Sequence, residues 1–284
     1  KAVRDGWMAG MRLIQLVGAN SRYFTDTSQK PPIDVAAGNC AVGLCIDFYG
    51  RQQQEAVRRR NSEVGGKAAG AGATATEHGR DARDTSERVG YVSPEGGSVS
   101  SVDPVGMLRG VKNRAASVAF MEFVLSLDGQ KLWSFKTGAP GGPERFALRR
   151  LPVRKDFYAH AEWKQWQSDP EEGPYAQQNP LIYRPQWTGA LFREMAFIVR
   201  VMCQDTHREL ASAWRAIIAA PEPAKARALA AMQDLSAVDY ERAGGEIRRA
   251  LGSKNKVDEV KMAKELADFF RANYARAEEM ARGR

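Results

Sequence analysis

Residues 41–46 read Ala-Val-Gly-Leu-Cys-Ile, a short and continuous apolar run that decides how the rest of the sequence is interpreted. A run of this length without polar alternation is typical of a strand buried on both faces of a parallel or mixed sheet. The polar element Asp47-Phe48-Tyr49 follows it directly. Open α/β sheets bind their ligands at the carboxyl edge, so the run predicts an α/β fold with a ligand site close to Tyr49.

Two further segments, residues 89–94 and 105–108, are predicted as short strands because they are apolar and are bounded by Pro and Gly. Residues 61–88 differ in composition, since they are rich in Gly, Ala and Thr and hold almost no large apolar side chain. Such a stretch cannot bury enough surface to offset its ordering entropy. It is therefore predicted to be a disordered surface insertion.

Helical periodicity marks both ends of the chain. Residues 2–17 place Trp7, Met11, Ile14 and Val17 on one stripe, and an amphipathic helix is predicted over residues 257–277. Between them, Asn113 and Ser126 stand where N-caps are expected, each directly before an apolar helical stretch. These patterns divide the chain into an α/β part, residues 1–155, and a mainly helical extension, residues 156–284.

The overall charge restricts the function less than the missing motifs do. The chain of 284 residues has a formal charge of +8, but both signs are interleaved along most of it. A solvated basic surface explains this better than a nucleic-acid site, so no nucleic-acid partner is predicted. A basic binding module for an anionic polymer such as nucleic acid is kept as the alternative. No apolar stretch approaches the roughly 20 residues that span a bilayer, so the chain is predicted not to span a membrane.

Catalytic and metal-binding signatures are missing from the sequence. It has no GxSxG, Walker, HExxH, CxxC or GxGxxG pattern, and its three histidines are scattered. Cys40 and Cys45 would lie about 16 Å apart on one strand, too far for a disulfide. A bond from either to Cys203 stays open. The chain is therefore predicted not to be an enzyme.

The order of the pieces between residues 33 and 156 resembles a known family. The segments "VAAGN" (35–39), "AVGLCIDFY" (41–49), "RVGYVSPEGG" (88–97) and "AFMEFVLSLDGQ" (119–130) follow one another as in the C-terminal lobe of class II periplasmic solute-binding proteins. The ferric-iron group of ABC importers is the most similar. The resemblance implies a mixed sheet flanked by helices, in a chain truncated at its N-terminus.

The resemblance also implies a function and a location. Such proteins are extracytoplasmic components of ABC importers, which close two lobes around a small ligand and deliver it to a membrane permease. We therefore expect a periplasmic or other extracytoplasmic protein, held through a lipid anchor if the upstream segment carries one, and monomeric when complete. No cofactor is expected, apart from ferric iron as a transported ligand.

The family pattern also implies the site residues. Ferric-binding relatives use two adjacent tyrosines at the end of the strand that corresponds to residues 41–49, but this chain has Phe48 before Tyr49. Tyr49 is thus the one implied metal ligand, and iron, an iron chelate, an anion and an organic solute all stay open. The remaining candidate ligand-binding residues are Asp47, Thr27, Ser28, Ser100, Ser101 and Asp103.

Overall fold

A computed structural model describes residues 1–70, 89–175 and 181–283. The chain divides into two units, which are treated separately below. Unit 1 joins the N-terminal residues Lys1–Phe24 to the C-terminal residues Arg184–Arg284, and unit 2 is the intervening segment Thr25–Tyr183. The boundary predicted between residues 155 and 156 falls inside unit 2.

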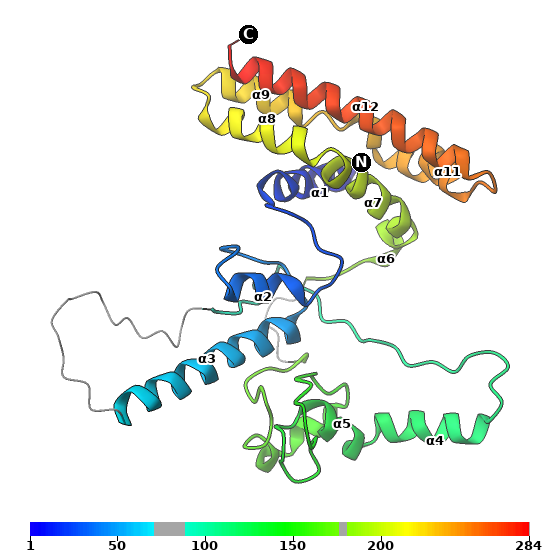
Figure 1. Cartoon of the computed structure of the whole chain (residues 1–284). Coiled ribbons are helices and arrows are strands. Elements are labelled where there is room, and N and C mark those ends of the chain that lie inside the picture. The colour runs from blue at the N-terminus through cyan, green and yellow to red at the C-terminus, as the bar shows by residue number, and fades with distance from the viewer. Residues whose placement is uncertain (71–88, 176–180, 284) are drawn as a thin grey trace. The chain divides into compact units, whose positions relative to one another are not determined.

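The predicted α/β fold is wrong. The described residues form helices and connecting coil, and Figure 1 shows no sheet among them. Their one β contact is an isolated antiparallel bridge between Phe135 and Gln167. A buried strand needs neighbours that pair with its N–H and C=O groups, and the described part of the chain provides none for residues 41–46.

The segment predicted to be a buried strand, residues 41–46, is exposed coil instead. Val42 and Leu44 are 80% and 75% exposed. Asp47, expected at the end of that strand, lies in the first turn of helix α3, Asp47–Gly70. A carboxylate there is favoured by the helix dipole, and it pairs with Arg51 one turn later at 2.6 Å. Residues 89–94 and 105–108 are likewise without strand structure.

Helix α3 also changes the outcome for the predicted insertion. The helix continues to Gly70, so residues 61–70 are helical where disorder was predicted. The rest of that prediction, residues 71–88, lies outside the described residues.

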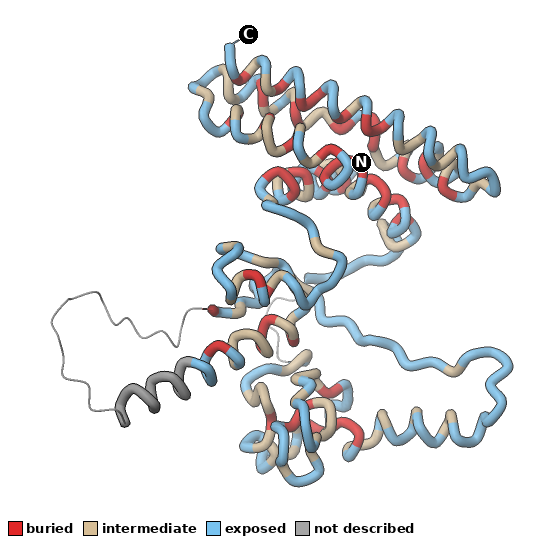
Figure 2. The backbone as a smooth tube through the Cα atoms, in the orientation of Figure 1, coloured by how far each residue is buried: buried red, intermediate tan, exposed pale blue. Residues whose placement is uncertain are grey.

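Unit 1 is a helical bundle with one apolar core (Figures 1 and 2). The long helix α12, Lys256–Ala281, packs along α8 and α9 and buries Leu266, Phe270 and Tyr274 completely. The predicted amphipathic helix at this end is therefore confirmed. The helices of unit 1 are α1 (Ala2–Asn20), α6 (Pro185–Thr188), η4 (Gly189–Leu191), α7 (Phe192–Val199), η5 (Arg200–Asp205), α8 (His207–Ala219), α9 (Ala224–Met232), η6 (Ser236–Val238), α10 (Tyr240–Arg242), η7 (Ala243–Ile247), α11 (Arg248–Gly252) and α12.

The predicted N-terminal helix exists as α1, but its buried stripe is rotated from the expected one. Trp7 and Met11 are buried, whereas Val17 is 43% exposed. The buried line continues through Gln15 and Gly18 instead. Gly18 is needed at this place, because a Cβ atom there would lie 2.7 Å from the sulfur of Cys203.

A buried polar network connects α1, η5 and α12. Gln15 donates to the carbonyl of Met232 at 2.9 Å and to the Tyr274 hydroxyl at 3.2 Å. Tyr274 in turn donates to the carbonyl of Met202 at 3.0 Å. Met202 lies in η5, which has π-helical geometry, and Thr206 also donates to its carbonyl, at 2.8 Å. These bonds satisfy backbone groups that the wider π turn leaves without a regular helical partner.

Unit 2 is held by short helices and side-chain bridges. The two predicted N-caps are confirmed, since Asn113 accepts from the Ala116 amide and Ser126 accepts from the Gly129 amide. Phe135 and Phe157 are fully buried and form a small aromatic core with neighbouring tryptophans. The helices of unit 2 are α2 (Lys30–Ala36), α3, α4 (Arg114–Leu125), α5 (Leu127–Ser134), η2 (Lys155–Ala159) and η3 (Ala161–Trp163).

Neither unit offers a helix that could cross a bilayer, as far as the described residues extend.

Candidate functional site

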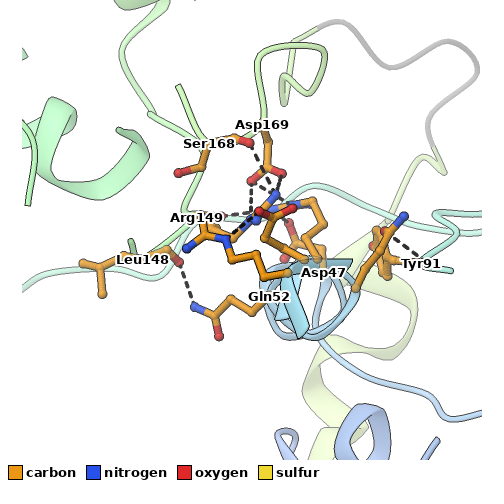
Figure 3. Close-up of polar contacts among 11 residues, drawn as sticks. Asp47, Gln52, Tyr91, Leu148, Arg149, Ser168 and Asp169 are labelled. Atoms are coloured by element: carbon orange, nitrogen blue, oxygen red, sulfur yellow. Dashed lines mark hydrogen bonds and ion pairs between the residues drawn. The ribbon is translucent and has the colours of Figure 1, made fainter. Parts of the chain in front are cut away.

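Unit 2 contains a cavity of about 380 Å³ that is lined by polar and charged groups from four separate segments. It lies beside the first turns of α3, and Figure 3 shows the polar contacts around it. The size is at the small end of the range for small-molecule sites, about 300–1,000 Å³. The lining residues are Arg51, Gln54, Glu55, Arg58, Tyr91, Arg149, Ser168, Asp169, Pro170, Glu171 and Glu172.

Arg51 is the central buried cation of this site, with 6% of its side chain exposed. It pairs with Asp47 one turn earlier on α3 and donates to the carbonyl of Arg149 at 3.0 Å. Its Nε lies 3.2 Å from Asp169 Oδ2, but the angle does not allow a hydrogen bond, so that contact is electrostatic only. Arg51 thus connects α3 to the backbone at Arg149 and to Asp169. Burying its charge costs desolvation free energy, which the attraction of the two carboxylates offsets.

Arg149 completes this network from the other side. Its guanidinium binds the carboxylate of Asp169 through two nitrogens, with Nε at 3.1 Å, and also donates to the Ser168 carbonyl at 3.3 Å. Its backbone has a φ of 55°, in the left-handed region that residues other than glycine seldom adopt. The fork-shaped contact with Asp169 holds this conformation, and the floor of the cavity is therefore fixed before any ligand arrives.

Tyr91 forms an aromatic part of the lining and depends on a glycine. Its ring packs so closely on α3 that a Cβ atom at Gly50 would lie 2.3 Å from it. The Arg51 guanidinium lies 5.9 Å from the ring centre, and the Tyr91 amide donates to Gln54 at 3.3 Å. Burial raises the pKa of Tyr91, so its phenol stays protonated at neutral pH and serves as a neutral hydrogen-bonding group.

Two lining groups have further hydrogen-bonding capacity. The hydroxyl of Ser168 is buried and has no hydrogen-bond partner within the described residues. Gln54 uses its side-chain oxygen for the Tyr91 amide, which leaves its amide nitrogen as a donor. Buried polar atoms without partners cost stability, so a ligand or water that binds them is favoured.

A larger hollow, about 570 Å³, lies in unit 1 where α11 meets α12. Its lining is short: Arg249, Ala250, Gly252, Ser253 and Asp258. Ser253 and Asp258 already bind each other at 2.6 Å. Because this hollow is an open depression in which Ser253 and Asp258 already bind each other, the smaller cavity in unit 2 is the better candidate for a ligand site.

Of the residues predicted from sequence, Asp47 takes part in the site, through its pair with Arg51. Tyr49 lies in the first turn of α3, and its ring contacts Phe48 with centroids 4.2 Å apart. It does not line the cavity, and its role as a metal ligand stays a prediction. No group of three His, Cys, Asp or Glu side chains within the described ranges is arranged to hold a metal ion.

The other predicted residues lie away from the lining. Asp103 is 84% exposed and pairs with Arg150, whose guanidinium covers the ring of Phe48 at 3.7 Å. Thr27 and Ser28 are exposed in the turn before α2. Ser100 and Ser101 are exposed in coil. The structure therefore joins Asp103 to the neighbourhood of Phe48, but it does not join the four hydroxyl residues to the cavity.

Sequence reasoning missed the residues that build the site. Arg51 and Arg149 are 98 positions apart, and no spacing rule connects them. One local signal was present, because Asp47 and Arg51 stand at the i, i+4 spacing that supports an ion pair on a helix. It was overlooked because residues 41–49 were interpreted as a strand.

Apart from Pro170, the lining is made of charged, amide, hydroxyl and phenol groups, and the described residues contribute no histidine or cysteine to it. It offers hydrogen bonds and charges at fixed positions, which suits binding of a small polar molecule. No family model matches this sequence, and no curated protein or solved structure is significantly similar to it.

Proposed function

We propose that this chain is a solute-binding protein that captures a small polar solute in the cavity of unit 2. The observation that carries the proposal is the fixed network of Arg51, Arg149 and Asp169, which lines the cavity from segments far apart in sequence. Preformed polar groups lower the cost of ordering a bound solute. The proposed action is reversible binding without covalent chemistry.

The wider role we propose is that of the extracytoplasmic component of an ABC importer, which passes its solute to a permease. Its support is the order of sequence segments over residues 33–156, together with the location of the cavity. Arg51 and Tyr91, which belong to or adjoin those segments, line the cavity, and Asp47 pairs with Arg51. The mixed sheet implied by the resemblance is absent from the described residues, so the proposed capture rests on the cavity and not on closure of two lobes.

Ferric iron is the solute that the cavity favours least. Its one phenol, Tyr91, has a raised pKa, and a ferric site needs phenolate or carboxylate oxygen. The most buried carboxylate, Asp169, is already bound by Arg149, and Glu171 and Glu172 belong to no group of three ligating side chains among the described residues. A solute that carries its own charged groups fits the lining better.

Isothermal titration calorimetry of the whole chain tests the proposal. The probes are inorganic phosphate, citrate, ferric citrate and a mixture of small amino acids, each with the wild type and with Arg58→Gln. Saturable binding of at least one probe, weakened by Arg58→Gln, supports capture in this cavity. If no probe binds, or if binding is the same in both proteins, the proposal is wrong.

A second candidate, binding of an anionic polymer, is favoured by one observation. Arg58, Arg59 and Arg60 follow one another on α3 and are exposed. Polymer binding would fall steeply with salt, because each phosphate contact releases a counterion. Fluorescence anisotropy with a labelled single-stranded DNA at rising salt, comparing Arg60→Gln with wild type, distinguishes the two. Arg60 does not line the cavity, so its loss weakens polymer binding alone.

A further inference from the structure

The floor of the cavity in unit 2 is electrically balanced before a ligand binds. Arg51 and Arg149 are its cations, and Asp47 and Asp169 are the carboxylates that pair with them. The charges of these ion pairs largely neutralise each other, so the floor shows no strong preference for an anion or a cation. Selection must come from the lining groups that have no such partner.

One such group is a cation on α3. One face of α3 contributes four lining residues at the spacing i, i+3, i+4 and i+7: Arg51, Gln54, Glu55 and Arg58. Arg58 makes no hydrogen bond or ion pair within the described residues, whereas Glu55 receives a 2.8 Å bond from Arg59. That bond lowers the pKa of Glu55, so this face holds both a free guanidinium and an ionised carboxylate.

The complementary groups are acidic and come from the turn at residues 169–172. Pro170 follows Asp169, and the Glu172 amide donates to the Asp169 carbonyl at 3.2 Å, which closes a β-turn. Because Asp169 is fixed by Arg149, the turn holds Glu171 and Glu172 at the cavity. Both are exposed, and neither is paired with a cation in the described parts of the chain.

We infer that the cavity selects a small zwitterionic solute, with an anionic group that binds Arg58 and an ammonium group that binds the carboxylates of Glu171 and Glu172. The inference rests on the proposed function and names its solute class. A simple anion bound at Arg58 leaves the carboxylates of Glu171 and Glu172 without a partner in this lining, and a simple cation bound at those carboxylates leaves Arg58 without one. Only a molecule that carries both charges is complementary to both sets.

A matched set of four-carbon compounds tests this on the whole chain by calorimetry. The probes are 4-aminobutanoate (zwitterion), butanoate and succinate (anions), and butylamine and 1,4-diaminobutane (cations). We expect 4-aminobutanoate to bind at least about 10-fold more tightly than each of the other four, which corresponds to about 1.4 kcal/mol.

Charge-neutral variants assign the two ends of the solute. Arg58→Gln should lower the affinity for 4-aminobutanoate about 10-fold, and Glu171→Gln combined with Glu172→Gln should do the same. Arg60→Gln is the matched control, because it removes the same charge from the same helix without touching the cavity. It should leave the affinity unchanged.

The outcomes separate this inference from the proposed function. If succinate or 1,4-diaminobutane binds as tightly as 4-aminobutanoate and Arg58→Gln or the double Glu variant weakens it, the cavity binds solutes but does not select zwitterions. If Arg60→Gln weakens binding as much as Arg58→Gln, the charge of α3 matters and the cavity does not. If no compound of this set or of the earlier panel binds, both ideas are overturned.

Discussion

Removing one hydroxyl from the core of unit 1 should cost little, although the group is fully buried. Tyr274→Phe deletes an oxygen that donates to the Met202 carbonyl and accepts from Gln15. The Met202 carbonyl still accepts from Thr206 at 2.8 Å, and Gln15 still donates to the Met232 carbonyl at 2.9 Å. Since neither partner loses its last bond, the loss in free energy of unfolding should be that of one net hydrogen bond, about 1 kcal/mol.

Two other variants set the scale for this value. Phe270→Ala removes a fully buried ring that stacks on Tyr274, with centroids 6.0 Å apart, and should cost about 3–5 kcal/mol. Gln15→Leu keeps the volume but takes from the Met232 carbonyl its side-chain donor, and should cost about 1–3 kcal/mol. The order Phe270→Ala, Gln15→Leu, Tyr274→Phe follows from which groups are left unpaired.

Urea unfolding of the whole chain, followed by far-UV circular dichroism, measures all three variants. Burial raises the pKa of Tyr274 above its ordinary value of about 10, so the phenol is protonated in both states. Its stability contribution should therefore be constant between about pH 6 and about pH 9, and change only at higher pH. If Tyr274→Phe cost as much as Phe270→Ala, the polar network and not apolar packing would hold unit 1, and the reasoning would be refuted.

The remaining predictions concern a glycine and the cysteines. Gly50→Ala should displace the Tyr91 ring, because the added Cβ would lie 2.3 Å from it. Calorimetry should then show weaker solute binding, while the circular dichroism signal of the helices stays the same. An unchanged affinity would show that Tyr91 does not belong to the site. Burial raises the pKa of Cys203 to about 12, so at neutral pH iodoacetamide should modify Cys40 first, and Cys203 only in urea. If mass spectrometry found that iodoacetamide modifies Cys203 as fast as Cys40 without urea, Cys203 would be accessible in the folded protein.

Features fixed within one or two helical turns could be predicted from the sequence. Asn113 and Ser126 were predicted as N-caps and bind the expected amides. The apolar spacing near the C-terminus predicted the helix that became α12. In each case the residues that decide the structure lie three or four positions apart, so the information is local.

The interpretation of residues 41–46 failed because a short apolar run does not specify its partners. The same residues suit a buried strand or a coil, and the choice depends on whether another segment pairs with their backbone. Within the described residues none does. Asp47 and Arg51 then stabilise the start of α3 where a strand end was predicted.

The candidate site depended even more on tertiary structure. Asp47 was identified from sequence, but its importance comes from Arg51, which reaches the carbonyl of Arg149, 98 residues away. Asp169 is drawn into the same network by Arg149. The sequence by itself determined the helices whose caps and apolar stripes are local, such as those that begin after Asn113 and Ser126 and the helix near the C-terminus, but not α3. Which charges share a cavity was decided by tertiary packing alone, because buried ion pairs form between residues whose separation along the chain follows no rule.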